Sequence, residues 1–180
     1  MSSPTLQKPI LIDTNLQLGV AIRSDQAPGF LFGGQGGLSS LHHSIGANLF
    51  LYANTPSQTS AAERQETRPP LRRAGIPTTF FFGAQPLLPL PFKMNDRNTW
   101  LFKLGAPLGV QWSNQYATPK ALIGFNLELA RYHFLSQNKI GLQSFAVGTS
   151  LFTTPLSDSK LTSFLIYLGI GPGIAFSLRR

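Results

Sequence analysis

The sequence predicts an all-β fold: a transmembrane antiparallel up-and-down β-barrel of about eight strands. Three observations lead to this prediction. Apolar residues alternate with small or polar residues along several segments. Those segments are long enough to cross a bilayer as tilted strands. Charged residues make up only 12% of the chain, about half the usual share, so little charge is available to cover a water-exposed surface.

The clearest alternating segment runs from Trp100 to Trp112. Its even-numbered residues are all apolar, whereas the residues between them are mostly small or polar. Twelve residue steps of about 3.3 Å give roughly 40 Å along a strand, and a tilt of about 45° reduces this to roughly 28 Å across the membrane. Barrels of this kind carry an apolar band about 25 Å tall, bordered by aromatic girdles. We therefore expect Trp100 and Trp112 to mark the two girdles.

The same alternation predicts the remaining strands. The second strand has the weakest signal, because the glycines of residues 33–37 suit a turn as well as a strand. In the fourth strand, Pro86, Pro89 and Pro91 cannot donate to a ladder, and we expect residues 86–91 to bulge or leave the sheet. The predicted strands are 15–24, 28–36, 42–54, 77–92, 98–113, 119–135, 139–152 and 160–178.

These strands form a single domain over residues 15–180, preceded by an N-terminal segment over residues 1–14. Small membrane barrels have short turns at one end and longer loops at the other. The long polar loop over residues 55–76 falls at the end where long loops are permitted. No uninterrupted apolar stretch of about 18 residues is present, so no transmembrane helix is expected. The N-terminus lacks a basic start followed by an apolar core, and we expect that a signal peptide has been removed.

Composition excludes several other functions. The chain has no cysteine, which rules out disulfides, thiolate metal sites and cysteine nucleophiles. Its net charge of +8 could suit nucleic acid, but the aromatic residues do not interleave with the basic ones, so no nucleic-acid partner is expected. The glycines of residues 33–37 are not followed by the Lys-Ser/Thr of a phosphate loop. Metal-ligand spacing is also absent, and we expect no metal or cofactor.

With this strand pattern the chain resembles the small eight-stranded outer-membrane proteins, such as the transmembrane domain of the OmpA family and the OmpX and OmpW types. The resemblance covers nearly the whole chain but concerns architecture and rests on no diagnostic motif. It implies a location in the bacterial outer membrane. It also implies a non-enzymatic role as a membrane anchor, a narrow pore or a surface-interaction protein. The implied partners are membrane lipid or detergent and lipopolysaccharide, and the oligomeric state is left open.

Glu128 is the only carboxylate in the core of a predicted strand, and the alternation points it into the barrel. If the fifth and sixth strands form a hairpin centred on residues 114–116, Glu128 lies opposite Lys103. A buried charge needs a partner, and Arg23 is the second candidate. Such a cluster would act as a structural plug or, alternatively, as an ion path or catalytic carboxylate. The predicted polar network of the lumen consists of Glu128, Lys103, Arg23, Asn126 and Gln111.

Two further hypotheses are kept. His42 and Ser44 would share a face on a strand, and with Glu128 they resemble the histidine, serine and glutamate of lipid A deacylase barrels, which would make the protein a lipid-modifying acyl hydrolase. A soluble lipocalin-like ligand-binding barrel would also alternate. In the favoured non-enzymatic hypothesis, the loop arginines contact lipopolysaccharide phosphates. These arginines are Arg64, Arg68, Arg72 and Arg73.

Overall fold

The fold is all-β throughout the part of the chain that the structure describes. The structure is a computed structural model that describes residues 10–24, 26–56, 78–94, 98–113, 118–134, 140–156 and 160–176. No helix in these ranges is long and apolar enough to cross a membrane. The strands are β1 (Ile10–Arg23), β2 (Gln26–Ser40), β3 (Ile45–Pro56), β4 (Thr79–Met94), β5 (Asn98–Gly105), β6 (Leu108–Ser113), β7 (Lys120–Phe134), β8 (Ile140–Thr153) and β9 (Thr162–Phe176).

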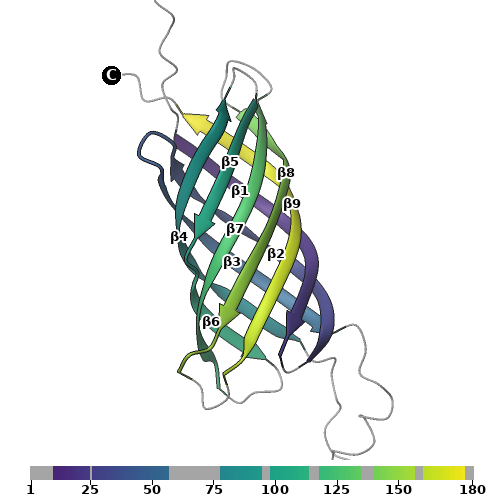
Figure 1. The fold of residues 1–180 in the computed structure, drawn as a ribbon. Helices are drawn as coiled ribbons and strands as arrows, with labels where there is room; N and C mark the ends of the chain where they lie inside the picture. The colour runs from purple at the N-terminus through teal and green to yellow at the C-terminus, as the bar shows by residue number, and fades with distance from the viewer. Residues whose placement is uncertain are drawn as a thin grey trace, which may run out of the picture.

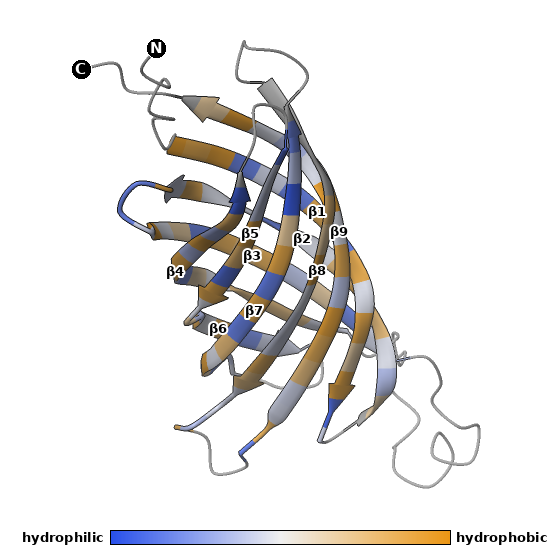
Figure 2. Cartoon of the chain, turned by 45° about the horizontal axis from the view of Figure 1, so that its top comes forward, coloured by the Kyte–Doolittle hydropathy of each residue, from blue (hydrophilic) through white to orange (hydrophobic). Residues whose placement is uncertain are grey.

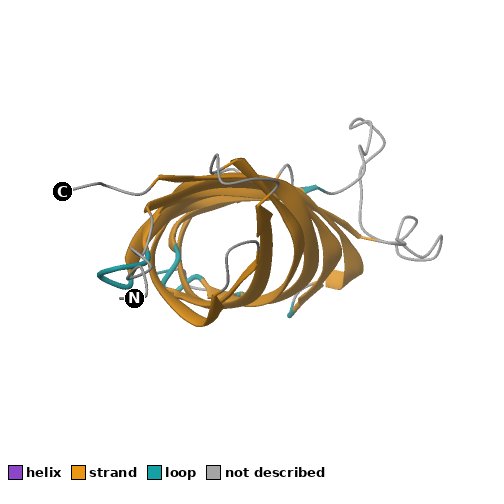
Figure 3. Cartoon of the chain, turned by 90° about the horizontal axis from the view of Figure 1, so that it is seen from above, coloured by secondary structure: helices purple, strands orange, loops and turns teal. Residues whose placement is uncertain are grey.

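The strands close into a barrel (Figure 3). Each strand is antiparallel to its neighbours, and β1 pairs with both β2 and β9, so the first and last strands seal the sheet. Strands β5 and β6 are two halves of one wall strand, because β4 and β7 each pair with both of them. The described ranges therefore form a closed barrel of eight wall strands, which confirms the predicted fold class. A closed barrel also leaves no unpaired sheet edge.

The fifth wall strand is interrupted at Pro107, which lies between β5 and β6. The backbone groups beside the break are still paired. The amide of Ala106 donates to the carbonyl of Pro86 over 3.2 Å, and the carbonyl of Pro107 accepts from the amide of Gly124 over 2.9 Å. Proline lacks an amide hydrogen, so the ladder stops there, but the neighbouring strands hold both halves in line.

The expectation that residues 86–91 leave the sheet is wrong. Strand β4 is continuous across them, with Pro86 opposite Ala47 and Pro89 opposite Lys103. The only irregularity in this pairing is a register shift between Pro91 and Lys93, which is the bulge that was expected. Proline keeps its carbonyl acceptor, and its φ is tolerated in a strand, so Pro86 and Pro89 each remove one donor while the register across them is unchanged.

Several predicted strand boundaries need correction, and strand β2 spans Gln26–Ser40 rather than residues 28–36. Strand β1 begins at Ile10 rather than at residue 15, so it includes residues 10–14 of the predicted N-terminal segment. Strand β3 begins at Ile45 rather than at residue 42, because residues 41–44 form a turn. Ser44 has a φ of 51°, a left-handed conformation that suits a tight turn and not a strand. The glycine-rich residues 33–37 lie inside β2 and form strand.

The two ends of the barrel differ in their connections (Figure 1). Strand β1 begins and β9 ends at the same end, where Ile10 pairs with Phe176; we call this the terminus end. The connections there span residues 41–44, 95–97 and 135–139, and all are short. The opposite end, which we call the loop end, has the long connection between β3 and β4. Long and short connections are thus distributed as predicted.

Along the strands, hydrophobic residues alternate with more hydrophilic ones (Figure 2), and exposed side chains alternate with buried ones. In β1 the residues Leu16 and Leu18 are 64% and 63% exposed, whereas Gln17 between them is fully buried. The same phase continues to the last strand, where Leu168 is exposed and Tyr167 is buried. Exposed aliphatic and aromatic side chains thus cover the outer wall, as the sequence predicts for a membrane-spanning barrel.

The central part of the lumen is filled by side chains in three layers, and further buried polar side chains, which include Arg23 and Gln111, lie nearer the loop end. Towards the loop end lies an apolar and aromatic cluster that includes Phe50, Tyr52, Phe81 and Phe152. The ring centroids of Phe50 and Phe152 are 5.7 Å apart. A second apolar cluster, which includes Leu101, lies towards the terminus end. Between the two clusters are buried charged and amide side chains. A narrow barrel is filled in this way when its interior has room only for side chains.

Candidate functional site

The centre of the lumen holds a buried charge cluster around Lys103. Its Nζ lies 2.8 Å from Oδ2 of Asp13 and 3.1 Å from Oε1 of Glu128. It also donates a 2.6 Å hydrogen bond to the hydroxyl of Tyr132, which in turn donates to Asp13. All of these side chains are at most 3% exposed. One ammonium group therefore bridges two carboxylates contributed by β1 and β7.

A chain of hydrogen bonds extends the cluster across the barrel. Gln35 of β2 donates to Glu128, and Gln85 of β4 donates to Gln35 over 2.9 Å. On the other side, the hydroxyl of Tyr167 on β9 lies 3.1 Å from Glu128 and 2.9 Å from Oδ1 of Asn126. The network therefore links strands that are not neighbours in the sheet, and it crosses the lumen rather than lining one wall.

Gly148 provides the space that Tyr167 occupies. A Cβ at Gly148 would lie 2.4 Å from both Cζ and the hydroxyl oxygen of Tyr167, which is closer than any real contact. Glycine at this position of β8 lets the tyrosine ring lie flat against the opposing backbone. Any larger residue would displace the hydroxyl that contacts Glu128 and Asn126.

The bonds of this cluster join buried charged groups of opposite sign to one another. A buried ion pair is costly unless further hydrogen bonds surround it, and here Gln35, Tyr132 and Tyr167 supply such bonds, although Oδ1 of Asp13 is buried without a hydrogen-bond partner among the described residues. The cluster is enclosed between the two apolar layers of the lumen. Among the described residues, no group of three or more histidine, aspartate or glutamate side chains could hold a metal ion.

The structure brings together only some of the residues proposed for this network. Lys103 and Glu128 are opposite each other in the β5–β7 register, as the hairpin centred on residues 114–116 requires, and Asn126 is joined to Glu128 through Tyr167. Arg23 is not part of the cluster. It lies ten residues along β1 from Asp13, roughly 33 Å away along the strand, and donates to Thr79 at the loop end.

Gln111 is also remote from the cluster. It is buried and pairs in register with Lys120 near the loop end. The sequence reasoning missed Asp13, because β1 was expected to start at residue 15. A signal was available, since Ile10 and Ile12 continue the even-numbered outward pattern of β1 and thereby place Asp13 inward.

The proposed catalytic pair does not have strand geometry. His42 and Ser44 lie in the turn between β2 and β3, where His42 is exposed and packs edge-on against His43 at 4.6 Å between ring centroids. Glu128 is at the centre of the lumen, where it contacts Gln35. Gln35 lies five residues before Ser40, the last residue of β2, so Glu128 is roughly 17 Å along the strand from the turn that holds His42 and Ser44. The three side chains therefore do not form a nucleophile, base and acid within contact distance.

The two tryptophans lie at opposite ends of the outer wall. Trp112 stacks on Phe80 towards the loop end, with ring centroids 5.4 Å apart. Trp100 lies 6.2 Å from the ring of Phe92 towards the terminus end. The predicted girdle positions therefore carry aromatic pairs that join neighbouring strands. Such rings favour the level of lipid headgroups on both sides of a bilayer.

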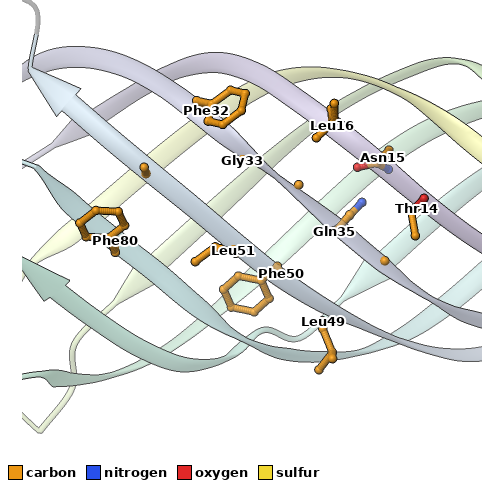
Figure 4. Close-up of a pocket in the computed structure, with 13 residues that line it drawn as sticks. Thr14, Asn15, Leu16, Phe32, Gly33, Gln35, Leu49, Phe50, Leu51 and Phe80 are labelled. Carbon is orange, nitrogen blue, oxygen red and sulfur yellow. The ribbon is translucent and has the colours of Figure 1, made fainter.

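A groove of about 620 Å³ crosses the outer wall of β1 to β4 (Figure 4). Its floor is the backbone of Gly34 and Gly36, whose outward positions carry no side chain. Leu16, Phe32 and Leu49 rise on its sides and are 58% to 69% exposed. The groove belongs to the apolar outer wall. The arginines assigned to the long loop (Arg64, Arg68, Arg72 and Arg73) lie outside the described residues.

A closed eight-stranded antiparallel barrel with an apolar outer wall and a charge-paired interior defines the class: this is a small transmembrane β-barrel. Among solved structures, it is similar to the crystal structure of neisserial surface protein A (NspA), with a TM-score of 0.56 and 10% identity over 93% of this chain and 97% of that chain. At this identity the likeness concerns the fold.

A further solved structure, the attachment invasion locus protein Ail of Yersinia pestis in a phospholipid bilayer nanodisc, matches with a TM-score of 0.40 and 13% identity. That match covers 91% of this chain and 99% of Ail. No protein-family description matches the sequence, and no curated protein matches it.

Proposed function

We propose that this protein is a non-enzymatic barrel of the bacterial outer membrane that anchors surface loops and does not conduct. The observation that carries the proposal is the filled lumen: Lys103, Glu128, Tyr132 and Tyr167 are all at most 1% exposed. Their hydrogen bonds tie opposite walls together. Of the three roles considered, a narrow pore requires a continuous polar path through the lumen. The apolar clusters on either side of the charge cluster argue against such a path.

We expect the reconstituted protein to produce no conductance steps in a planar bilayer. The physical reason is that the side chains filling the lumen close the barrel, and not the long loop. A variant lacking residues 60–74 should therefore also be silent. This deletion suits the structure, because Asn54 and Thr79 already pair across the base of the loop. Heat-dependent gel migration would confirm that both proteins are folded.

Discrete steps in the intact protein would contradict the proposal of a closed anchor. Steps that appear only after the deletion would place the seal in the loop and not in the charge cluster. The absence of conductance steps in both proteins supports a scaffold role, in which the barrel anchors the connections at the loop end and these make the contacts with partners.

Within this proposal, the loop arginines bind anionic lipopolysaccharide phosphates. Guanidinium groups match phosphate oxygens with paired hydrogen bonds. We expect R64Q/R68Q to weaken binding to lipopolysaccharide-containing vesicles by roughly 30-fold, since each cation near an anionic surface contributes about 1 kcal/mol and 1.4 kcal/mol is about tenfold. R179Q/R180Q removes the same charge after β9, which ends at the opposite end of the barrel. If both variants lost the same binding affinity, the effect would come from the net charge of the protein and not from the loop arginines.

A further inference from the structure

A polar cluster interrupts the apolar outer wall where β5 and β7 approach the terminus end. Trp100 lies directly opposite Arg131, and Asn98 lies directly opposite His133. These four side chains point outward, because the residues that alternate with them, including Tyr132 and Leu101, are fully buried. We call them the rim cluster. It uses none of the side chains of the lumen network.

The rim cluster holds its arginine in place. Nη2 of Arg131 donates a 3.1 Å hydrogen bond to Oδ1 of Asn98, and the guanidinium carbon lies 5.6 Å from the ring centroid of Trp100. A cation over an indole ring at this distance is favourable. The guanidinium plane is therefore fixed against the wall. Little side-chain entropy would be lost when it bound an anion.

Asn98 also orients His133. Nδ1 of His133 lies 3.0 Å from the same Oδ1 of Asn98. Because that oxygen is an acceptor, Nδ1 must carry the hydrogen and donate it. This fixes which ring nitrogen is used and leaves Nε2 on the side of the imidazole away from Asn98. Two basic side chains of β7 are thus aligned by one amide of β5.

The surroundings of the rim cluster are basic and aromatic. Lys93 is exposed and lies opposite Trp100 in the β4–β5 register. Phe92 packs against both Trp100 and Phe102, with ring centroids 6.2 Å and 4.9 Å apart. The two carboxylates among the described residues, Asp13 and Glu128, both face the lumen. The described outer wall therefore presents cations here with no carboxylate among them.

We propose that the rim cluster is a binding site for the headgroup phosphate of an anionic phospholipid. The site lies at the edge of the apolar wall, beside a tryptophan, which is the level at which headgroups meet a membrane protein. Arginine binds phosphate through paired donors, Lys93 adds positive charge beside it, and His133 lies next to the same asparagine. The preference for an anionic lipid over a zwitterionic one follows from this excess of cations.

This inference rests on the proposed membrane location, and the test separates the two. The chain has two tryptophans, so W112F leaves Trp100 as the only indole, beside the proposed site. In vesicles, quenching of Trp100 by brominated phosphatidylglycerol is compared with quenching by brominated phosphatidylcholine. The ratio gives the relative affinity of the two lipids at this position. W100F leaves Trp112 as the reporter at the other end.

We expect Trp100 to prefer the anionic lipid by roughly fivefold, the factor that one cation near the surface supplies. The preference should fall to near unity in W112F/R131Q and should decrease with salt. It should persist in W112F/K160Q, which removes an exposed cation beyond the other end of the wall. Trp112 reports on the opposite end of the barrel, so its quenching ratio should be the same in W100F and in W100F/R131Q. Heat-dependent gel migration establishes that each variant is folded.

Equal quenching of Trp100 by both lipids would overturn the site while leaving the membrane location intact. A preference that survives R131Q in a folded variant would also overturn it. If neither lipid quenches Trp100, the indole does not face a bilayer, and the proposed function fails together with this inference.

Discussion

Replacing Lys103 with methionine is expected to lower the free energy of unfolding by about 3–5 kcal/mol, the usual cost of breaking a buried ion pair. Methionine has similar length but no charge, so the carboxylates of Asp13 and Glu128 would remain buried without their shared cation. The loss can be measured by urea unfolding in lipid vesicles, followed by tryptophan fluorescence.

The triple variant K103M/D13N/E128Q serves as the control for this prediction. It removes all three charges while keeping the shapes of the side chains. Replacing a complete buried ion pair is often neutral, so most of the lost stability should return. K160M removes an exposed lysine and should change stability by less than about 0.5 kcal/mol. If K103M lowered the free energy of unfolding no more than K160M, the ion pairs of Lys103 would not contribute to stability.

Replacing Leu168 with arginine is expected to cost about 2–4 kcal/mol in a bilayer, as arginine does near the midplane of a membrane barrel. Leu168 is 59% exposed and lies in the middle of β9. The penalty arises because the charge must leave water for hydrocarbon. Urea unfolding in vesicles would measure it.

Leu156 offers a matched comparison on the same protein. It is 87% exposed but follows the end of β8 at the loop end, where arginine should cost about 0–1 kcal/mol. A soluble lipocalin-like barrel would tolerate both substitutions equally, because water covers both positions. Equal effects of L168R and L156R would therefore favour that alternative over a membrane barrel.

The sequence was sufficient to predict the features that repeat along the chain. A period of two determines which side chains face outward, and a one-residue error would reverse every face. The residues of β5 and β6 therefore had the predicted orientation, including Lys103 inward and Trp112 outward. The Lys103–Glu128 pairing was predictable for a related reason. It depends on a short hairpin, whose register is set by the position of its turn.

Contacts across the lumen could not be predicted in this way. Gln35 and Glu128 are 93 residues apart, and their meeting depends on how far the closed sheet is staggered, which no single hairpin determines. The inward position of Asp13 was not predicted, for a different reason. Ile10 and Ile12 continue the outward alternation, but Leu11 between them is also apolar and is buried, so the two faces differ less in polarity there than in the rest of β1.

The pairing of β1 with β9 has a consequence for assembly. These strands come from the two ends of the chain, so closing the barrel requires the longest-range contact the sequence allows, and such contacts form slowly. The charge cluster also depends on closure, because Asp13 comes from β1 while Lys103 and Glu128 come from the middle of the chain. A partly built sheet would lack one of the two carboxylates around Lys103. Folding is therefore expected to be cooperative, with the polar core completed only when the last strand joins the first.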